Sequence, residues 1–84
     1  MKEQQYQKKL SDILEEEGWY VIKLIKTNKN GIPDLIAIKE DKTIFIECKT
    51  LKGKLSKIQE FRLDELKAKG IECFVSYGKE IKKY

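Results

Sequence analysis

Charged residues lie at the ends of two apolar, strand-like segments in the middle of this chain, and this stretch constrains the fold more than any other. It runs from residue 31 to residue 49, with Gly-Ile-Pro-Asp at 31–34 before the first segment and Glu-Cys-Lys at 47–49 closing the second. Charge at such positions costs free energy unless it is paired or binds something. We therefore take Asp34, Glu47 and Lys49 as candidate site residues.

The pattern of apolar residues predicts two helices and four strands around this stretch. Apolar residues recur every three to four positions over 3–17 and again over 56–69, and a glycine follows each segment, as is typical of amphipathic helices. Segments 19–25, 34–38, 43–49 and 72–77 are rich in strand-forming residues. The predicted order is α-β-β-β-α-β, in which a crossover helix sets the fourth strand parallel to a neighbour.

The expected core consists of the apolar stripes of the two helices together with the aromatic and cysteine side chains. The stripes comprise Tyr6, Leu10, Ile13 and Leu14 on the first helix, and Leu55, Ile58, Phe61 and Leu66 on the second. We interpret the aromatic residues as core rather than as platforms for stacking on bases, including Trp19, Phe45 and Phe74. Cys48 and Cys73 are too few for a zinc site in a chain without histidine, and we expect small buried side chains there.

Composition indicates a single stand-alone domain over residues 1–84 and restricts its partners. Apolar residues make up 40% and charged residues 38% of the chain, and their separation into periodic segments argues against a disordered polyelectrolyte. The net charge is +4, and Arg62 is the only arginine among 18 basic residues. Lysine binds phosphate as a mobile point charge, whereas the reading of base edges favours arginine. The lysines therefore either bind a nucleic-acid backbone without strong sequence choice or only keep the protein in solution.

No signal peptide and no apolar run approaching about 18 residues occurs in the sequence. We therefore expect an intracellular protein without a membrane partner.

The turn between the two middle strands decides which side chains meet. If it is centred between Glu40 and Asp41, opposed residues have numbers that sum to 81, and Asp34 lies opposite Glu47. Opposed residues share one face of the sheet with their Cβ atoms about 5 Å apart, so the two carboxylates repel each other unless a cation lies between them. Lys49 emerges on the same face. A slip of the turn by one residue would place the two acids on opposite faces.

This geometry predicts a cation site built from oxygen ligands. The carboxylates of Asp34 and Glu47, completed by the backbone carbonyl of Cys48, suit Mg²⁺ or Mn²⁺. A cation held there lowers the pKa of water and neutralises charge on a phosphate, and Lys49 adds positive charge and orients the nucleophile. The alternative is an ion pair of the acids with Lys49 at a strand end. The opposed geometry and the apolar flanks favour the metal site.

The whole pattern resembles a known nuclease family. The segments 31–34 and 47–49, with Gln59 downstream, are similar to the virus-type replication-repair nuclease (VRR-NUC) domain, and the resemblance extends over residues 3–77. That domain belongs to the PD-(D/E)xK superfamily, which includes restriction endonucleases and archaeal Holliday-junction resolvases. The resemblance implies a restriction-endonuclease-like α/β fold with an αβββαβ core, in which helices flank a four-stranded mixed sheet. It also implies that Asp34, Glu47 and the Cys48 carbonyl bind metal and that Lys49 is catalytic.

Two further residues match the family pattern, and each has an alternative explanation. Glu3 is the best match for a glutamate on the first helix and shares a helical stripe with Leu10, which makes it a candidate metal ligand. Alternatively, it is a carboxylate favoured by the helix N-terminus. Gln59 matches a glutamine of the second helix and is a candidate catalytic residue, or it belongs to a capping box that begins at Ser56.

The resemblance implies an endodeoxyribonuclease that depends on Mg²⁺ or Mn²⁺ and needs no small-molecule cofactor. By the same resemblance we predict a structure-selective enzyme of the Holliday-junction-resolving type, acting as a homodimer on branched DNA, and a phage or prophage origin. The alternatives are a nuclease for flaps, nicked or linear duplex, a catalytically silent DNA-binding module, and a lysine-rich adaptor for a protein partner. The lysines expected either to contact the DNA backbone or to be merely solvated are Lys26, Lys29, Lys52, Lys54 and Lys57.

Overall fold

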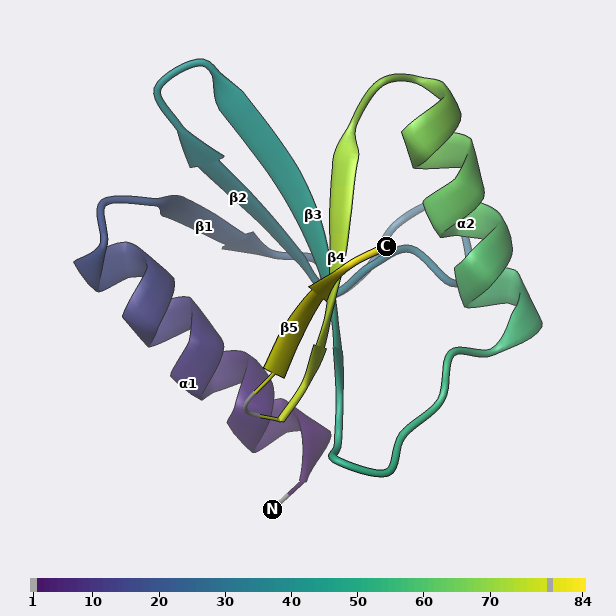
Figure 1. The fold of residues 1–84 in the computed structure, drawn as a ribbon, viewed down its shortest axis with the longest axis horizontal. Helices are drawn as coiled ribbons and strands as arrows, with labels where there is room; N and C mark the ends of the chain where they lie inside the picture. Colours follow the sequence, from purple (N-terminus) through teal and green to yellow (C-terminus); the bar gives the residue numbers. More distant parts are fainter. Residues whose placement is uncertain (1, 79) are drawn as a thin grey trace.

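A mixed five-stranded sheet with a helix on each face forms the fold of this chain (Figure 1), seen in a computed structural model that describes residues 2–78 and 80–84. The elements are α1 (Glu3–Glu16), β1 (Tyr20–Lys23), β2 (Leu35–Lys39), β3 (Lys42–Lys49), α2 (Lys57–Ala68), β4 (Glu72–Tyr77) and β5 (Glu80–Lys83). The strands are ordered β1-β2-β3-β4-β5 across the sheet. Only β3 and β4 are parallel, which confirms the predicted meander and crossover helix.

The structure adds a fifth strand to the four predicted. β5 runs antiparallel to β4, with Val75 opposite Lys82. All four residues of β5 are exposed, so no apolar alternation marks the strand in the sequence. Pairing with the backbone of β4, rather than burial of side chains, forms this strand.

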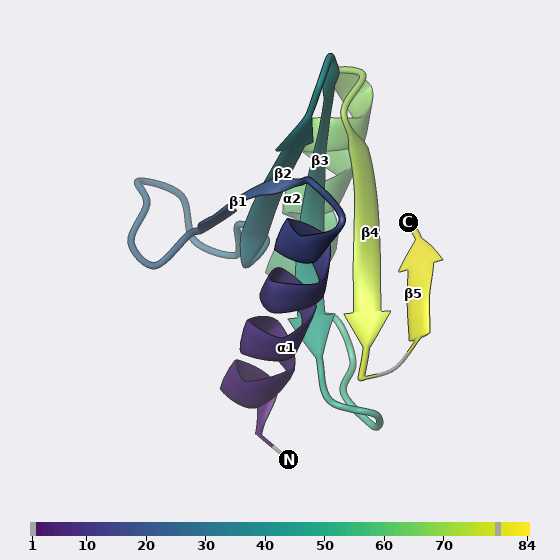
Figure 2. The ribbon, with the colours of Figure 1, turned by 90° about the vertical axis from the view of Figure 1, so that its left-hand side faces the viewer.

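Helices α1 and α2 lie on opposite faces of the sheet (Figure 2). An apolar cluster of side chains lies beneath each helix. Successive side chains of a strand point to opposite faces, so Ile44, Ile46 and Cys48 of β3 lie under α1, while Phe45 lies on the side of α2. Both cysteines are buried and free, as expected. Neither described helix is long and apolar enough to cross a membrane.

The helices bury narrower stripes than predicted. The placement of Phe61 in the core is wrong, because this side chain is 53% exposed, and Ile13 and Ile58 are also exposed. The buried positions are Gln7, Leu10 and Leu14 on α1 and Leu63 on α2. Helix α2 packs mainly on β4, so the sheet covers only a narrow arc of it. The sequence pattern marks a broad apolar arc, but it does not specify which part of that arc faces the sheet.

Gly31 brings the loop between β1 and β2 against α2. Its φ is +79°, and a Cβ added there would lie 2.8 Å from Cγ1 of Ile58 and 3.1 Å from the Ile58 backbone carbon. The position therefore requires glycine both for its left-handed backbone and for its close contact. This contact fixes the start of β2 relative to α2.

We expect Gly31→Ala to lower the free energy of unfolding by about 2 kcal/mol, because it combines backbone strain with overpacking. The matched control is Gly70→Ala, where φ is +86° but nothing lies within 4 Å of the added Cβ. Urea denaturation of the two variants separates the steric contact from the strain. Equal losses of stability in the two variants would contradict the role of the Ile58 contact.

Candidate metal centre

The hairpin of β2 and β3 has the predicted register and brings Asp34 to Glu47. Lys39 pairs with Lys42 and Leu35 with Ile46, so their numbers sum to 81. Asp34 immediately precedes β2, and continuing this register places it opposite Glu47. The Cys48 backbone N–H donates a hydrogen bond of 2.8 Å to Oδ2 of Asp34, which holds this carboxylate against β3.

Three carboxylates converge at this point. Glu3, Asp34 and Glu47 each offer one oxygen, and these three oxygens all lie within 4.8 Å of one another. Glu3 reaches the cluster from the N-terminus of α1 because it lies on the stripe of Gln7, Leu10 and Leu14 that faces the sheet. Like charges at this spacing repel, so the cluster is suited to a divalent cation with oxygen ligands.

Glu47 is the buried member of the cluster. It is only 2% exposed, and its Oε1 has no hydrogen-bond partner among the described residues. Burial, and then the neighbouring charge of Asp34, raise its pKa to about 9 although the charge of Lys49 acts in the opposite direction. A buried carboxylate oxygen without a partner is costly. A cation would satisfy this oxygen, so the residues present fit a bound metal ion.

The Cys48 side chain lies outside this donor set. It is completely buried beneath α1, and burial together with the charges of Asp34 and Glu47 raises the pKa of its thiol to about 12. A protonated thiol is a poor metal ligand. Only the backbone of Cys48 is therefore available to the centre, which agrees with a ligand set of oxygen atoms.

Lys49 and Gln59 both approach Glu47 on the side of α2. Nζ of Lys49 lies 3.9 Å from Oε2 of Glu47, and Nε2 of Gln59 donates a hydrogen bond of 3.2 Å to the same oxygen. The side-chain Oε1 of Gln59 also accepts a hydrogen bond of 2.9 Å from the Ser56 backbone N–H, which forms the capping box of α2. One side chain therefore both caps α2 and contacts Glu47. A single long ion pair with Lys49 leaves most of the negative charge of the cluster uncompensated.

Cation binding at this centre is expected to release about one proton per ion near neutral pH. With its pKa at about 9, metal-free Glu47 carries a proton at pH 7, and it loses that proton when it becomes a ligand. Titration calorimetry with Mn²⁺ in two buffers of different ionisation enthalpy measures the release. A binding heat that does not depend on the buffer would refute this coupling.

Four of the five lysines predicted to contact DNA line two separate clefts. Lys26 and Lys29 belong to the loop between β1 and β2 and line a cleft of about 370 Å³ that reaches Asp34. Lys52 and Lys54 line a second cleft of about 700 Å³ that Tyr77 and Lys82 complete.

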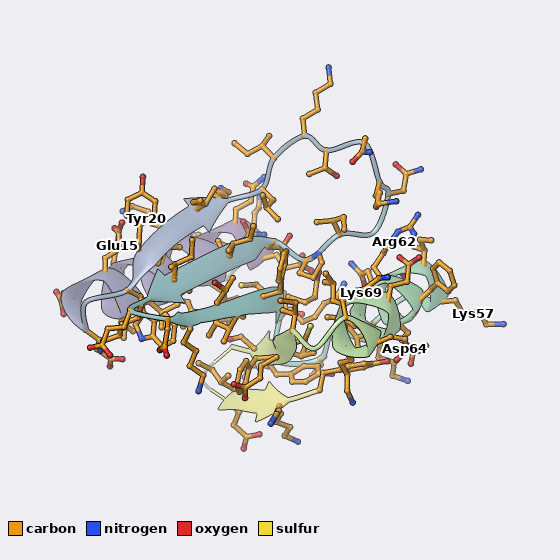
Figure 3. All side chains as sticks on the ribbon, turned by 90° about the horizontal axis from the view of Figure 1, so that it is seen from above. Glu15, Tyr20, Lys57, Arg62, Asp64 and Lys69 are labelled. Atoms are coloured by element: carbon orange, nitrogen blue, oxygen red, sulfur yellow. The ribbon has the colours of Figure 1, made fainter. Side chains whose placement is uncertain are left out.

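Lys57, by contrast, extends from the start of α2 away from the sheet (Figure 3).

Sequence reasoning missed two basic residues, one that lines the second cleft and one that contacts the loop between β1 and β2. Lys82 belongs to the strand that has no apolar pattern. Arg62 donates from Nε to the Asn30 carbonyl at 2.8 Å, and its only signal in the sequence is that it is the sole arginine.

The comparisons with known proteins agree with this architecture. A model of the VRR-NUC domain family matches residues 1–80. A solved structure of Hjc from Archaeoglobus fulgidus, a Holliday junction resolvase from an archaeal hyperthermophile, resembles the chain with a TM-score of 0.71 and 19% sequence identity. The similarity covers 96% of this chain and 74% of that chain, and at this identity it establishes the fold. No curated protein matches the sequence significantly.

Proposed function

Since this chain belongs to the VRR-NUC domain family, we propose that it is a metal-dependent endodeoxyribonuclease that selects its DNA by structure. The observation that carries the proposal is the convergence of Glu3, Asp34 and Glu47, with the unpartnered Oε1 of Glu47 inside the cluster. A four-way junction is the proposed substrate, supported by the similarity to a Holliday junction resolvase. Because symmetric cutting of a junction requires two active sites, we include a homodimer in the proposal.

Asp34 and Glu47 would hold Mg²⁺ or Mn²⁺, with Glu3 and the Cys48 carbonyl as additional ligands. When bound, such a cation lowers the pKa of water and neutralises charge on the phosphate. The chain's own residues prepare the centre: the Cys48 N–H orients Asp34, and Gln59 holds Oε2 of Glu47 while Oε1 stays available. Preorganised ligands of this kind need little rearrangement when the ion enters.

Lys49 would act on the phosphate. Its side chain is 11% exposed and lies beside Glu47, so its ammonium is held at the edge of the centre. Positive charge fixed there would stabilise the charge that develops on the phosphate oxygens during hydrolysis. The exposed lysines of the two neighbouring clefts would bind the DNA backbone without reading its sequence.

Incubation of a labelled four-way junction and a linear duplex of the same sequence with Mg²⁺, Mn²⁺ or a chelator tests the proposal. We expect cutting that requires the metal, favours the junction and is symmetric, together with a native mass of two chains. Binding of the junction without cutting in either metal would identify a catalytically silent module. Preferred cutting of flaps or nicked duplex would correct the substrate, and failure to bind any DNA at low salt would favour a protein adaptor.

Gln59→Glu is expected to reduce junction cleavage about 10- to 100-fold, in the range of other residues that orient metal ligands. Glutamate still completes the capping box of α2, but it has no N–H to donate to Glu47 and adds a repelling charge. Gln5→Glu is the matched control, because Gln5 fills the same position in the capping box of α1. Cleavage rates are compared at equal helix content by circular dichroism. Full activity of Gln59→Glu would show that Gln59 only caps the helix.

A further inference from the structure

The loop between β1 and β2 projects from the fold (Figure 2), and its residues line a cleft that reaches Asp34. The loop also carries an apolar residue into solvent. Ile25 is 85% exposed, more than any other large hydrophobic side chain of the described residues. It is followed by Lys26 and Lys29, which are also exposed. An isoleucine so fully exposed among lysines contributes nothing to the core of this domain.

The loop holds this side chain in a defined place. At its base, the Leu24 N–H donates to the Asp34 carbonyl at 2.8 Å. At its tip, the Thr27 hydroxyl donates to the Lys29 carbonyl at 2.8 Å. On its return, Arg62 donates to the Asn30 carbonyl, and Figure 3 shows Arg62 on α2 beside the end of the loop. A loop fixed at three points presents Ile25 with little loss of entropy on binding.

The cleft between this loop and Asp34 connects Ile25 with the carboxylate cluster. Its volume is about 370 Å³, and its lining includes Ile25, Lys26, Lys29, Gly31 and Asp34. A DNA strand with one phosphate at the metal centre would run along the two lysines, whose charges suit the neighbouring phosphates. Ile25 lines the same cleft, and its apolar side chain is suited to contact with bases rather than with phosphates.

We propose that Ile25 is a wedge that enters a base step at the branch point of DNA, while Lys26 and Lys29 hold the flanking phosphates. This inference rests on the proposed nuclease function and identifies the residue that would select branched DNA. Proteins that distort DNA insert isoleucine-sized apolar wedges between bases, at a cost of a few kcal/mol for each unstacked step. That cost is least where the bases are already unpaired or poorly stacked. The wedge therefore favours a branch point over a continuous duplex.

Ile25→Ala is the test variant, and Ile81→Ala is its matched control. Both positions are exposed isoleucines, but Ile81 lies on β5, outside the cleft that reaches Asp34. We expect Ile25→Ala to lower junction cleavage about 10-fold, a loss of about 1.4 kcal/mol in transition-state binding, with little change on linear duplex. Ile81→Ala should leave both rates unchanged. The melting temperature verifies that each variant is folded.

A second readout does not depend on cleavage. A junction with 2-aminopurine at the branch point, in Ca²⁺, should gain fluorescence on binding wild-type protein and Ile81→Ala but not Ile25→Ala. Equal fluorescence and equal junction preference in Ile25→Ala would overturn the wedge, as would a change of native mass, which would assign Ile25 to a contact between proteins. The proposed nuclease activity is tested separately. If the wild-type protein raises the fluorescence but does not cut the junction, the role of Ile25 as a wedge is supported and the nuclease activity is refuted.

Discussion

Asp34→Asn is expected to abolish detectable metal-dependent DNA cleavage, lowering the rate by about 10³-fold, the upper end of the effects seen when one electrostatic contributor to a transition state is removed. Asparagine keeps the shape of the side chain and an oxygen that accepts the 2.8 Å hydrogen bond from the Cys48 N–H. The hairpin should therefore stay intact. What is lost is the negative charge that, with Glu3 and Glu47, would hold the cation.

The matched control is Asp12→Asn, which makes the same chemical change in an exposed aspartate paired with Lys8 on α1. Single-turnover cleavage of the junction at saturating Mn²⁺ compares the two variants. The control should cut at the wild-type rate, and Asp34→Asn should still bind the junction. Cleavage that survives in Asp34→Asn would exclude the proposed centre as the site of chemistry.

Glu47→Gln is expected to stabilise the metal-free protein while it removes the response to metal. Burial and the Asp34 charge raise the pKa of Glu47 from 4.5 to about 9, so the metal-free fold prefers the neutral side chain. Glutamine imitates this neutral form, because it keeps an oxygen and adds a donor. The gain in free energy of unfolding at pH 9 should amount to several kcal/mol, since each pKa unit corresponds to about 1.4 kcal/mol.

The direction in which stability changes with pH follows from the raised pKa of Glu47. Between pH 4.5 and about 9 the folded protein binds a proton at Glu47 that the unfolded chain has released. The contribution of this group to stability is thus fully present below pH 4.5 and is lost as the pH rises through about 9. Glu47→Gln should remove this decline, whereas Glu15→Gln, at an exposed glutamate of α1, should retain it.

Thermal melts of the three proteins from pH 5 to pH 9, with and without Mn²⁺, measure both effects. Wild-type protein should lose stability towards alkaline pH and regain it with Mn²⁺. Glu47→Gln should melt higher without metal and respond little to it. A decline with pH that persists in Glu47→Gln would show that another group causes it.

The sequence by itself determined the order of the elements from α1 to β4 and the register of the β2–β3 hairpin. Periodicity of apolar residues is a local property, and the turn at Glu40, where φ is +56°, fixes which residues of the two strands pair. The opposition of Asp34 and Glu47 follows from that register. The resemblance to the VRR-NUC domain also rested on the sequence alone, since its motif residues lie at fixed positions along the chain.

Only the tertiary structure decided what depends on packing between distant segments. The approach of Glu3 to the acids depends on how α1 lies across the sheet, and the hydrogen bond from Gln59 to Glu47 depends on where α2 meets β3. β5 forms by pairing with β4 and has no buried face, so no pattern of apolar residues in the sequence predicted this strand. The exposure of Phe61 follows from the narrow contact of α2. Periodicity records which side chains avoid water along one element, but the position of each element on its neighbours results from the packing of the whole domain.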